Sequence, residues 1–254
     1  RTAMRKASHR LMKIVRSCAF TLIAASLSSG VIRAAEIKVV TSGAFTAAYL
    51  ELVPEYERAT HNKLVTVFGP SMGTTINAIP KRLERGEAID VVIMAAPALA
   101  DLIKQGKVLG GSRVDLVQSK IGMAVRAGAP KPDISTVDAL KRTLLAAKSI
   151  GYSDSASGVY LSTELFPKLG IWDQIKGKTR KIEADPVGGF VAKGEVEIGF
   201  QQISELRPVK GIDIVGELPP GAQRITVFSA GIPATSKQPE AAKALIQWLA
   251  SPAA

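Results

Sequence analysis

The chain has 254 residues, of which 46% are hydrophobic and 5% aromatic, and its formal net charge is +11. This composition excludes a disordered or fibrous protein, and the length is sufficient for two modest domains. Seven basic residues and no acidic residue lie within residues 1–35, which leaves a net charge of +4 for the rest of the chain. That remainder has no dense basic run with interleaved aromatic residues, so we expect no nucleic-acid partner.

Residues 1–35 have the pattern of a secretory signal peptide, with Met4 as the expected start. A basic stretch that ends at Arg16 precedes an apolar run that begins at Cys18, and small residues follow up to Ala35. A short membrane anchor is the alternative interpretation, but the apolar run is brief for a bilayer span. Cys18 is the only cysteine, so the mature exported chain would have no disulfide bond.

From Glu36 onward, apolar strand patterns alternate with helical patterns. This alternation predicts an α/β fold with mainly parallel sheets and helices on both faces. The expected strands lie at 37–40, 64–68, 90–94, 121–125, 149–152, 181–183, 198–200, 212–216 and 224–230. The expected helices lie at 45–59, 74–85, 97–105, 136–145, 190–194 and 239–249, and one more begins at 159.

Four polar loops join strand ends to helix starts, at 41–44, 69–75, 153–158 and 185–189. Ligands of open parallel sheets bind at the carboxyl ends of the strands, where helix starts also present unpaired N–H groups. In the second loop, the Ser71 hydroxyl lies just before a helix that we expect to open at about Thr74. None of the loops contains Lys, Arg or His, so together they predict an anion site of neutral donors. An ordinary capped turn is the alternative for each loop alone.

Motifs of catalysis or cofactor binding do not occur in this sequence. There is no phosphate-binding GxxxxGK[ST], no GxGxxG, no GxSxG and no cluster with metal-ligand spacing, so we expect no cofactor and no bound metal. Asp154 and Asp185 would serve as an acid/base pair in a secreted hydrolase. Carboxylates that cap nearby N–H groups are the favoured interpretation of both residues, because Asp is common in caps and turns.

Five short motifs follow one another along the chain: IKVVTSGAFT from 37, FGPSMGTT from 68, GEAIDVVI from 86, ASGVY from 156 and KLGIWD from 168. This ordered set resembles the periplasmic molybdate-binding proteins of ABC transporters. The resemblance extends over essentially all of residues 36–254, and it implies two α/β lobes that are joined by two crossover segments and close on a tetrahedral oxyanion. By this resemblance, lobe one comprises 36–118 plus 228–254, and lobe two comprises 119–227.

The resemblance also implies the ligand-binding positions. Such proteins hold the oxyanion with hydroxyl and backbone N–H donors. The first-loop position is Ala44, where the family commonly has Ser, so that only a backbone N–H remains unless Ser42 turns inward. A tyrosine that often completes the shell is replaced by Gln202. The implied site residues are Ser42, Ala44, Ser71, Ser157, Val187 and Gln202.

We therefore expect an exported, periplasmic, monomeric solute-binding protein that captures its ligand without catalysis. The favoured ligand is molybdate or tungstate, which the protein would deliver to the membrane permease of an ABC transporter. A different oxyanion or a small organic acid is the alternative ligand, because Ala44 and Gln202 depart from the family pattern. A secreted hydrolase that uses Asp154 and Asp185 is the alternative of another class.

Overall fold

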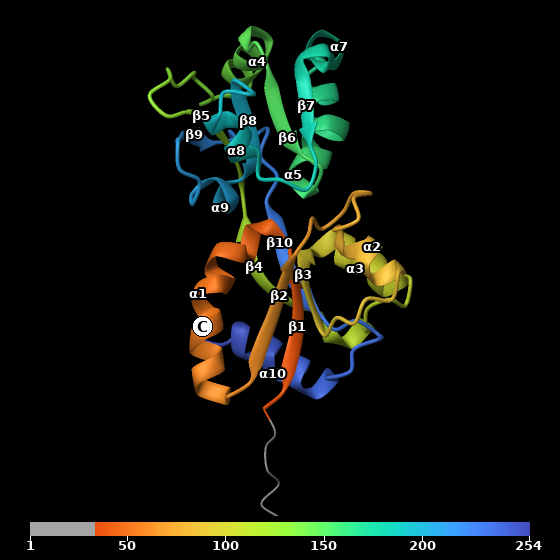
Figure 1. The fold of residues 1–254 in the computed structure, drawn as a ribbon. Helices are drawn as coiled ribbons and strands as arrows, with labels where there is room; N and C mark the ends of the chain where they lie inside the picture. The colour runs from red at the N-terminus through yellow and green to blue at the C-terminus, as the bar shows by residue number, and fades with distance from the viewer. Residues whose placement is uncertain (1–33) are drawn as a thin grey trace, which may run out of the picture. The chain divides into compact units, whose positions relative to one another are not determined.

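The computed structural model describes residues 34–254, so the predicted signal peptide lies outside the described residues except for its last two positions. Two five-stranded sheets form the framework (Figure 1). The first sheet has the order β2-β1-β3-β10-β4, and its strands are β1 (Glu36–Thr41), β2 (Lys63–Phe68), β3 (Val91–Ala95), β4 (Val114–Ser119) and β10 (Thr226–Gly231). The second has the order β7-β6-β8-β5-β9, and its strands are β5 (Ile121–Arg126), β6 (Ile150–Ser153), β7 (Thr179–Ile182), β8 (Ile198–Gln202) and β9 (Ile212–Glu217).

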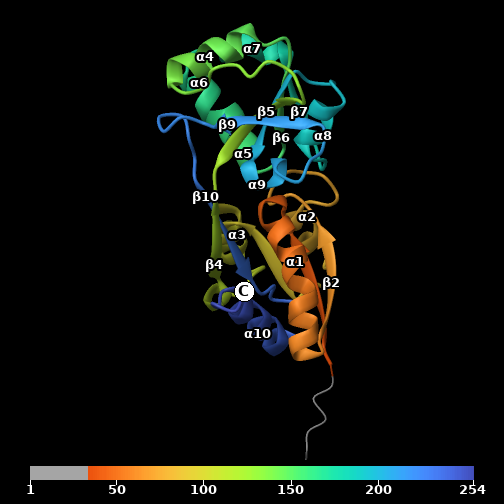
Figure 2. The same cartoon turned by 90° about the vertical axis from the view of Figure 1, so that its left-hand side faces the viewer.

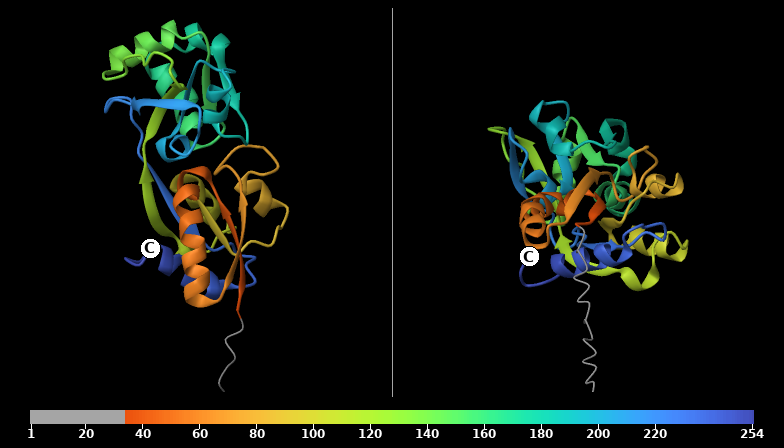
Figure 3. Two further views of the ribbon diagram at one scale, coloured as in Figure 1. Left: turned by 60° about the vertical axis from the view of Figure 1, so that its left-hand side comes forward. Right: turned by 60° about the horizontal axis from the view of Figure 1, so that its bottom comes forward.

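Four of the five strands in each sheet run in the same direction. The exceptions are β10, which is antiparallel to β3 and β4, and β5, which is antiparallel to β8 and β9. The chain passes from one sheet to the other twice, through Lys120 between β4 and β5 and again between β9 and β10 (Figures 2 and 3). The prediction of a two-lobed α/β fold with mainly parallel sheets is confirmed.

Helices cover both faces of the first sheet because successive strand residues point to opposite sides. Val39 packs in the core on one face and Val40 in the core on the other. Residues of α1 and α10 belong to the Val39 core, whereas residues of α2 and α3 belong to the Val40 core. These helices are α1 (Gly43–Thr60), α10 (Pro239–Leu249), α2 (Ile79–Glu84) and α3 (Ala96–Lys104).

The second sheet is covered in the same way. A large core contains Phe200 of β8 and Phe166, while a smaller core on the α8 side contains Val187 and Val191. The helical segments are α4 (Val137–Ala146), α5 (Ala156–Tyr160), η2 (Leu161–Leu165), α6 (Phe166–Lys168), α7 (Trp172–Ile175), η3 (Lys176–Lys178), α8 (Val187–Ala192) and α9 (Ile203–Leu206), and η1 (Gly110–Ser112) precedes β4.

One predicted helix start is wrong. The helix expected from Thr74 begins only at Ile79, and residues 69–78 form an irregular loop. Gly73 has a φ of +102°, which interrupts a right-handed helix, while Pro80 favours a helix start at its actual position. The sequence interpretation also missed β4, α7 and α9, which are short or have no distinct apolar period.

Candidate functional site

A cavity of about 520 Å³ lies where loops of the two sheets meet. Residues 201–205, at the junction of β8 and α9, form part of its wall. Among the described residues that line this cavity there is no Lys, Arg or His, so a bound anion would be held by hydroxyl, amide and backbone N–H groups. All four predicted loops contribute to the cavity wall, through residues 41–43, 68–70, 153–157 and 184–186.

Ser42 and Ser71 form a hydrogen-bonded pair at the start of α1. The backbone N–H of Ala95 donates to Ser71 Oγ, and Ser71 Oγ donates to Ser42 Oγ, both over 2.8 Å. Because Ser42 Oγ accepts this bond, its own proton remains available to a ligand. Ser42 lines the cavity, whereas Ser71 is fully buried and does not. Ser71 is therefore linked to the cavity through Ser42, and its role in binding stays a prediction.

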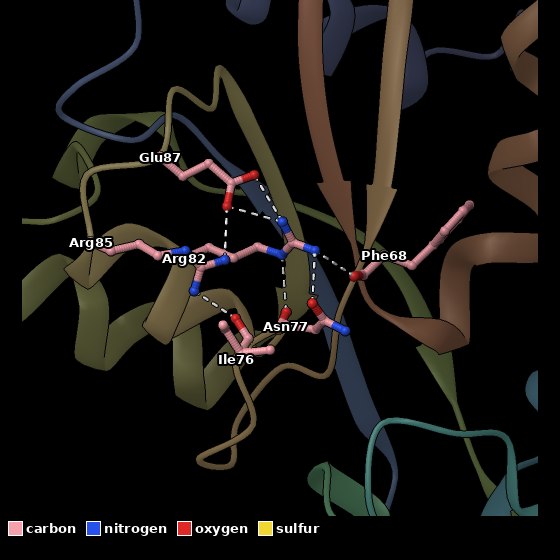
Figure 4. Close-up of polar contacts among 6 residues, drawn as sticks. All are labelled: Phe68, Ile76, Asn77, Arg82, Arg85 and Glu87. Carbon is pink, nitrogen blue, oxygen red and sulfur yellow. Dashed lines mark hydrogen bonds and ion pairs between the residues drawn. The ribbon is translucent and has the colours of Figure 1, made fainter.

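The guanidinium of Arg82 holds the irregular loop at 69–78 in place (Figure 4). It donates to both carboxylate oxygens of Glu87, over 2.8 and 3.0 Å. It also donates to the main-chain oxygens of Asn77 (3.1 Å) and Phe68 (3.3 Å). Phe68 and Asn77 lie near opposite ends of the loop, and Arg85 Nη1 donates to the main-chain oxygen of Ile76 between them (2.6 Å). Two arginine side chains therefore hold a segment that has no regular hydrogen bonding of its own.

On the opposite wall, the third loop presents several serine hydroxyls. Ser157 lines the cavity and lies 3.1 Å from Ser153, oxygen to oxygen. Ser155 Oγ accepts a hydrogen bond from the backbone N–H of Ser71 (3.1 Å), which ties the second loop to the third. The predicted residues Ser42 and Ser157 therefore lie on two walls of one cavity.

Ala44 and Val187 do not line the cavity. Ala44 is buried in an apolar cluster with Ala95 and Phe228. The Val187 N–H, which the resemblance implied as a ligand donor, donates instead to Gln201 Oε1 (2.9 Å). In this structure neither residue presents a side chain to the cavity, and their roles in binding stay predictions.

Gln202 lines the cavity and is almost completely buried. Its Nε2 donates to Thr226 Oγ1 over a long 3.4 Å, and its Oε1 is buried without a hydrogen-bond partner among the described residues. A buried polar atom without a partner costs about 1–3 kcal/mol. A ligand that donates a hydrogen bond at this point would remove that cost.

The two acidic residues of the predicted loops both line the cavity. Asp154 accepts a hydrogen bond from the Ala184 N–H (3.4 Å), which agrees with the interpretation as a loop cap. Burial raises the pKa of Asp154, and the Ala184 hydrogen bond partly offsets this. Asp185 follows Ala184 directly and lies on the same wall.

Glu205, on α9, is a cavity residue that the sequence interpretation missed. Its Oε2 accepts a hydrogen bond from Gln201 Nε2 (2.6 Å) and lies against the α-carbon of Gly43, where an added Cβ would be only 1.9 Å away. Burial raises the pKa of Glu205 to about 7, a rise that the Gln201 hydrogen bond opposes and the charge of Asp154 reinforces. The sequence signal for Glu205 is that it follows Gln201 by four positions, just after an apolar strand.

No group of three or more His, Cys, Asp or Glu side chains within residues 34–254 could hold a metal ion. No helix in the same range has both the length and the apolar composition needed to cross a membrane.

Comparison with known proteins identifies relatives of two kinds. A Pseudomonas protein named aconitate isomerase is 53% identical over 215 residues, which cover 85% of this chain and 82% of that protein. The molybdate-binding protein ModA of Azotobacter vinelandii is 26% identical over 243 residues, or 91% of each chain. The solved structure of a periplasmic molybdate-binding protein of Azotobacter vinelandii superimposes with a TM-score of 0.67 at 22% identity, over 85% of this chain and 94% of that one.

The family model that matches is described as bacterial extracellular solute-binding protein, and it matches residues 37–254. This range includes every residue that lines the cavity. The chain therefore belongs to the bacterial extracellular solute-binding proteins.

Proposed function

We propose that this solute-binding protein takes a small polycarboxylate, aconitate, into the cavity and interconverts its cis and trans isomers. The observation that carries the proposal is the 53% identity to a protein named aconitate isomerase, which is far above the 26% identity to a molybdate-binding protein. The sequence alone led us to expect capture without catalysis. The added isomerisation step is supported by this relative and by the acidic side chains in the cavity wall.

The cavity suits an organic acid better than a tetrahedral oxyanion. Its volume of about 520 Å³ lies in the range of roughly 300–1,000 Å³ that is typical of small-molecule sites. The Gln202 amide can serve a ligand as an acceptor or, turned over, as a donor, because its one partner, the Thr226 hydroxyl, can bond to either end of it. A partly protonated polycarboxylate has an O–H group that could donate to the amide oxygen, while its carboxylates accept from the serine hydroxyls.

The isomerisation needs only proton transfer. One C–H bond of the CH2 group next to the double bond breaks, and the electron pair spreads over the allylic system. A new C–H bond then forms at the former vinylic carbon, so that the double bond moves by one position and its new geometry is set during reprotonation. Atoms and electrons balance without an oxidant or a cofactor, and the protein must supply a proton acceptor and donors that hold the carboxylates.

Delivery of a captured solute to a membrane permease of an ABC transporter is the second candidate function. It is supported by the family and by the distant relatives that are named as molybdate-binding proteins. Under this function the favoured ligand remains molybdate or tungstate, which the protein would release unchanged. The two functions therefore differ in the ligand that stabilises the protein and in the fate of that ligand.

A ligand panel in a thermal-shift assay tests the binding step. We expect cis- and trans-aconitate to raise the melting temperature by several degrees at 100 times the dissociation constant, because such saturation adds about 2.7 kcal/mol. Molybdate, tungstate and sulfate at the same concentrations should change it much less. A large shift with molybdate and none with either aconitate isomer would contradict aconitate binding and favour oxyanion transport as the function.

Replacing Ser71 by Ala should weaken aconitate binding without removing any cavity-lining atom. The substitution deletes the donor to Ser42 Oγ, so the Ser42 hydroxyl loses its fixed orientation. We expect a loss of about 0.5–1.5 kcal/mol in binding free energy, the usual value of one neutral hydrogen bond. Titration calorimetry of the wild type and the variant measures it, and equal affinities would show that the pair does not act on the ligand.

A further inference from the structure

Glu205 is one of three acidic residues that line the cavity, together with Asp154 and Asp185. An ionised carboxylate in a wall without Lys, Arg or His repels an anionic ligand, so it is a disadvantage to a protein that only captures anions. Glu205 lies on α9, opposite the start of α1, so it faces the end of that helix that presents N–H groups.

We propose that the Glu205 carboxylate takes the proton from the bound acid and returns it to a different carbon, a role that rests on the isomerisation proposed above. In the first step a substrate C–H bond breaks and an O–H bond forms on Glu205. In the second step that O–H bond breaks and a C–H bond forms at the other end of the allylic system. Glu205 ends as the carboxylate with which it began, and no other reactant is consumed.

Three neighbours prepare Glu205 for this step. Gln201 donates to Oε2, which leaves Oε1 as the atom available to exchange a proton. The Val187 N–H can only donate, so its bond to Gln201 Oε1 fixes which end of the Gln201 amide faces Glu205. Gly43 lacks the Cβ that would collide with the carboxylate. Gln201 is therefore a positioning residue.

Burial supports the assignment, because it raises the pKa of Glu205 to about 7. A group with a pKa near the working pH both accepts and returns a proton efficiently. The other titratable residues that line the cavity are Asp154 and Asp185, and the charge of Asp154 contributes to the rise. Asp154 already accepts a backbone hydrogen bond from Ala184, which makes it the weaker candidate.

The test compares Glu205→Gln with Glu55→Gln, the same exchange at an exposed position of α1 outside the cavity. Conversion of trans-aconitate is followed by proton NMR, and binding of both isomers by thermal shift. We expect Glu205→Gln to lower the conversion rate at least ~100-fold while aconitate still raises its melting temperature. Glu55→Gln should convert at the wild-type rate.

The outcomes separate this inference from the proposed function. If the wild type itself converts neither isomer, the proposed isomerisation fails. If the wild type is active and Glu205→Gln keeps more than a third of its rate, or loses aconitate binding together with activity, Glu205 does not carry the proton and the isomerase function stands without it.

The pH dependence of kcat/KM gives a second test, because a purely structural role of Gln201 would leave it unchanged. The wild-type kcat/KM should rise with pH through the pKa of Glu205, because the ionised form takes the proton. Gln201→Met removes a hydrogen bond that holds this pKa down, so the rise should move to higher pH. An unchanged profile in the active variant would overturn the positioning role of Gln201.

Discussion

Glu205→Gln should make the protein more stable at pH 8 by about 2–3 kcal/mol, with no gain at pH 4. The pKa of Glu205 is about 7 in the folded protein and 4.5 without the fold, and each pKa unit corresponds to about 1.4 kcal/mol. The stability associated with this raised pKa is fully present below pH 4.5 and is lost as the pH rises through 7. Glutamine has no charge to bury at either pH. The difference in free energy of unfolding between the two proteins should therefore grow as the pH rises from 4.5 to 7.

Urea unfolding of both proteins at pH 4, 6 and 8 measures this difference. Glu55→Gln is the matched control, because it makes the same exchange at an exposed position. An equal free energy of unfolding for wild type and Glu205→Gln at pH 8 would mean that burial of the ionised Glu205 carboxylate does not destabilise the fold.

Arg82→Ala should lower the free energy of unfolding by about 2–3 kcal/mol. The side chains of Arg82 and Glu87 are only 12% and 21% exposed, and removal of the guanidinium leaves the partly buried Glu87 carboxylate with Arg85 as its remaining ion-pair partner. The carbonyl oxygens of Phe68 and Asn77 also lose a donor. Because the loop at 69–78 depends on these bonds, aconitate binding should weaken as well.

Arg85→Ala is the comparison for this substitution, since Arg85 also pairs with Glu87 and also donates to a loop carbonyl, that of Ile76 (2.6 Å), but is 39% exposed (Figure 4). Exposed ion pairs contribute at most about 1 kcal/mol, so its effect should be the smaller one. Urea unfolding and titration calorimetry on both variants give the comparison. Equal losses in stability would show that burial of the Arg82 pair is not what holds the loop.

The fold and the location of the site could be predicted because they depend on local patterns. Buried strands such as Val91–Ala95 are read as apolar runs, and each of the four polar loops follows one of the strands that the sequence predicts, β1, β2, β6 or β7. The edge strand β4 could not be identified this way, because only one of its residues is buried. Helix α9 has only four residues, too few to show a helical period.

The chemistry of the cavity depends on contacts between distant segments, which the sequence does not display. Glu205 is significant because Gly43, 162 positions earlier, lies against its carboxylate. Likewise, the Ser71 hydroxyl is directed toward Ser42 by the Ala95 N–H of a neighbouring strand, and not toward the ligand space. A prediction from loop composition found these serines but could not tell which one reaches the cavity.

The most direct measurement is proton NMR of each aconitate isomer, incubated separately with a catalytic amount of the wild-type protein. We predict that both samples reach the same mixture of cis- and trans-aconitate, in buffer without any added metal or cofactor. Two unchanged spectra, recorded under conditions where the thermal-shift assay shows aconitate bound, would contradict the isomerase function and leave a protein that binds its solute without converting it.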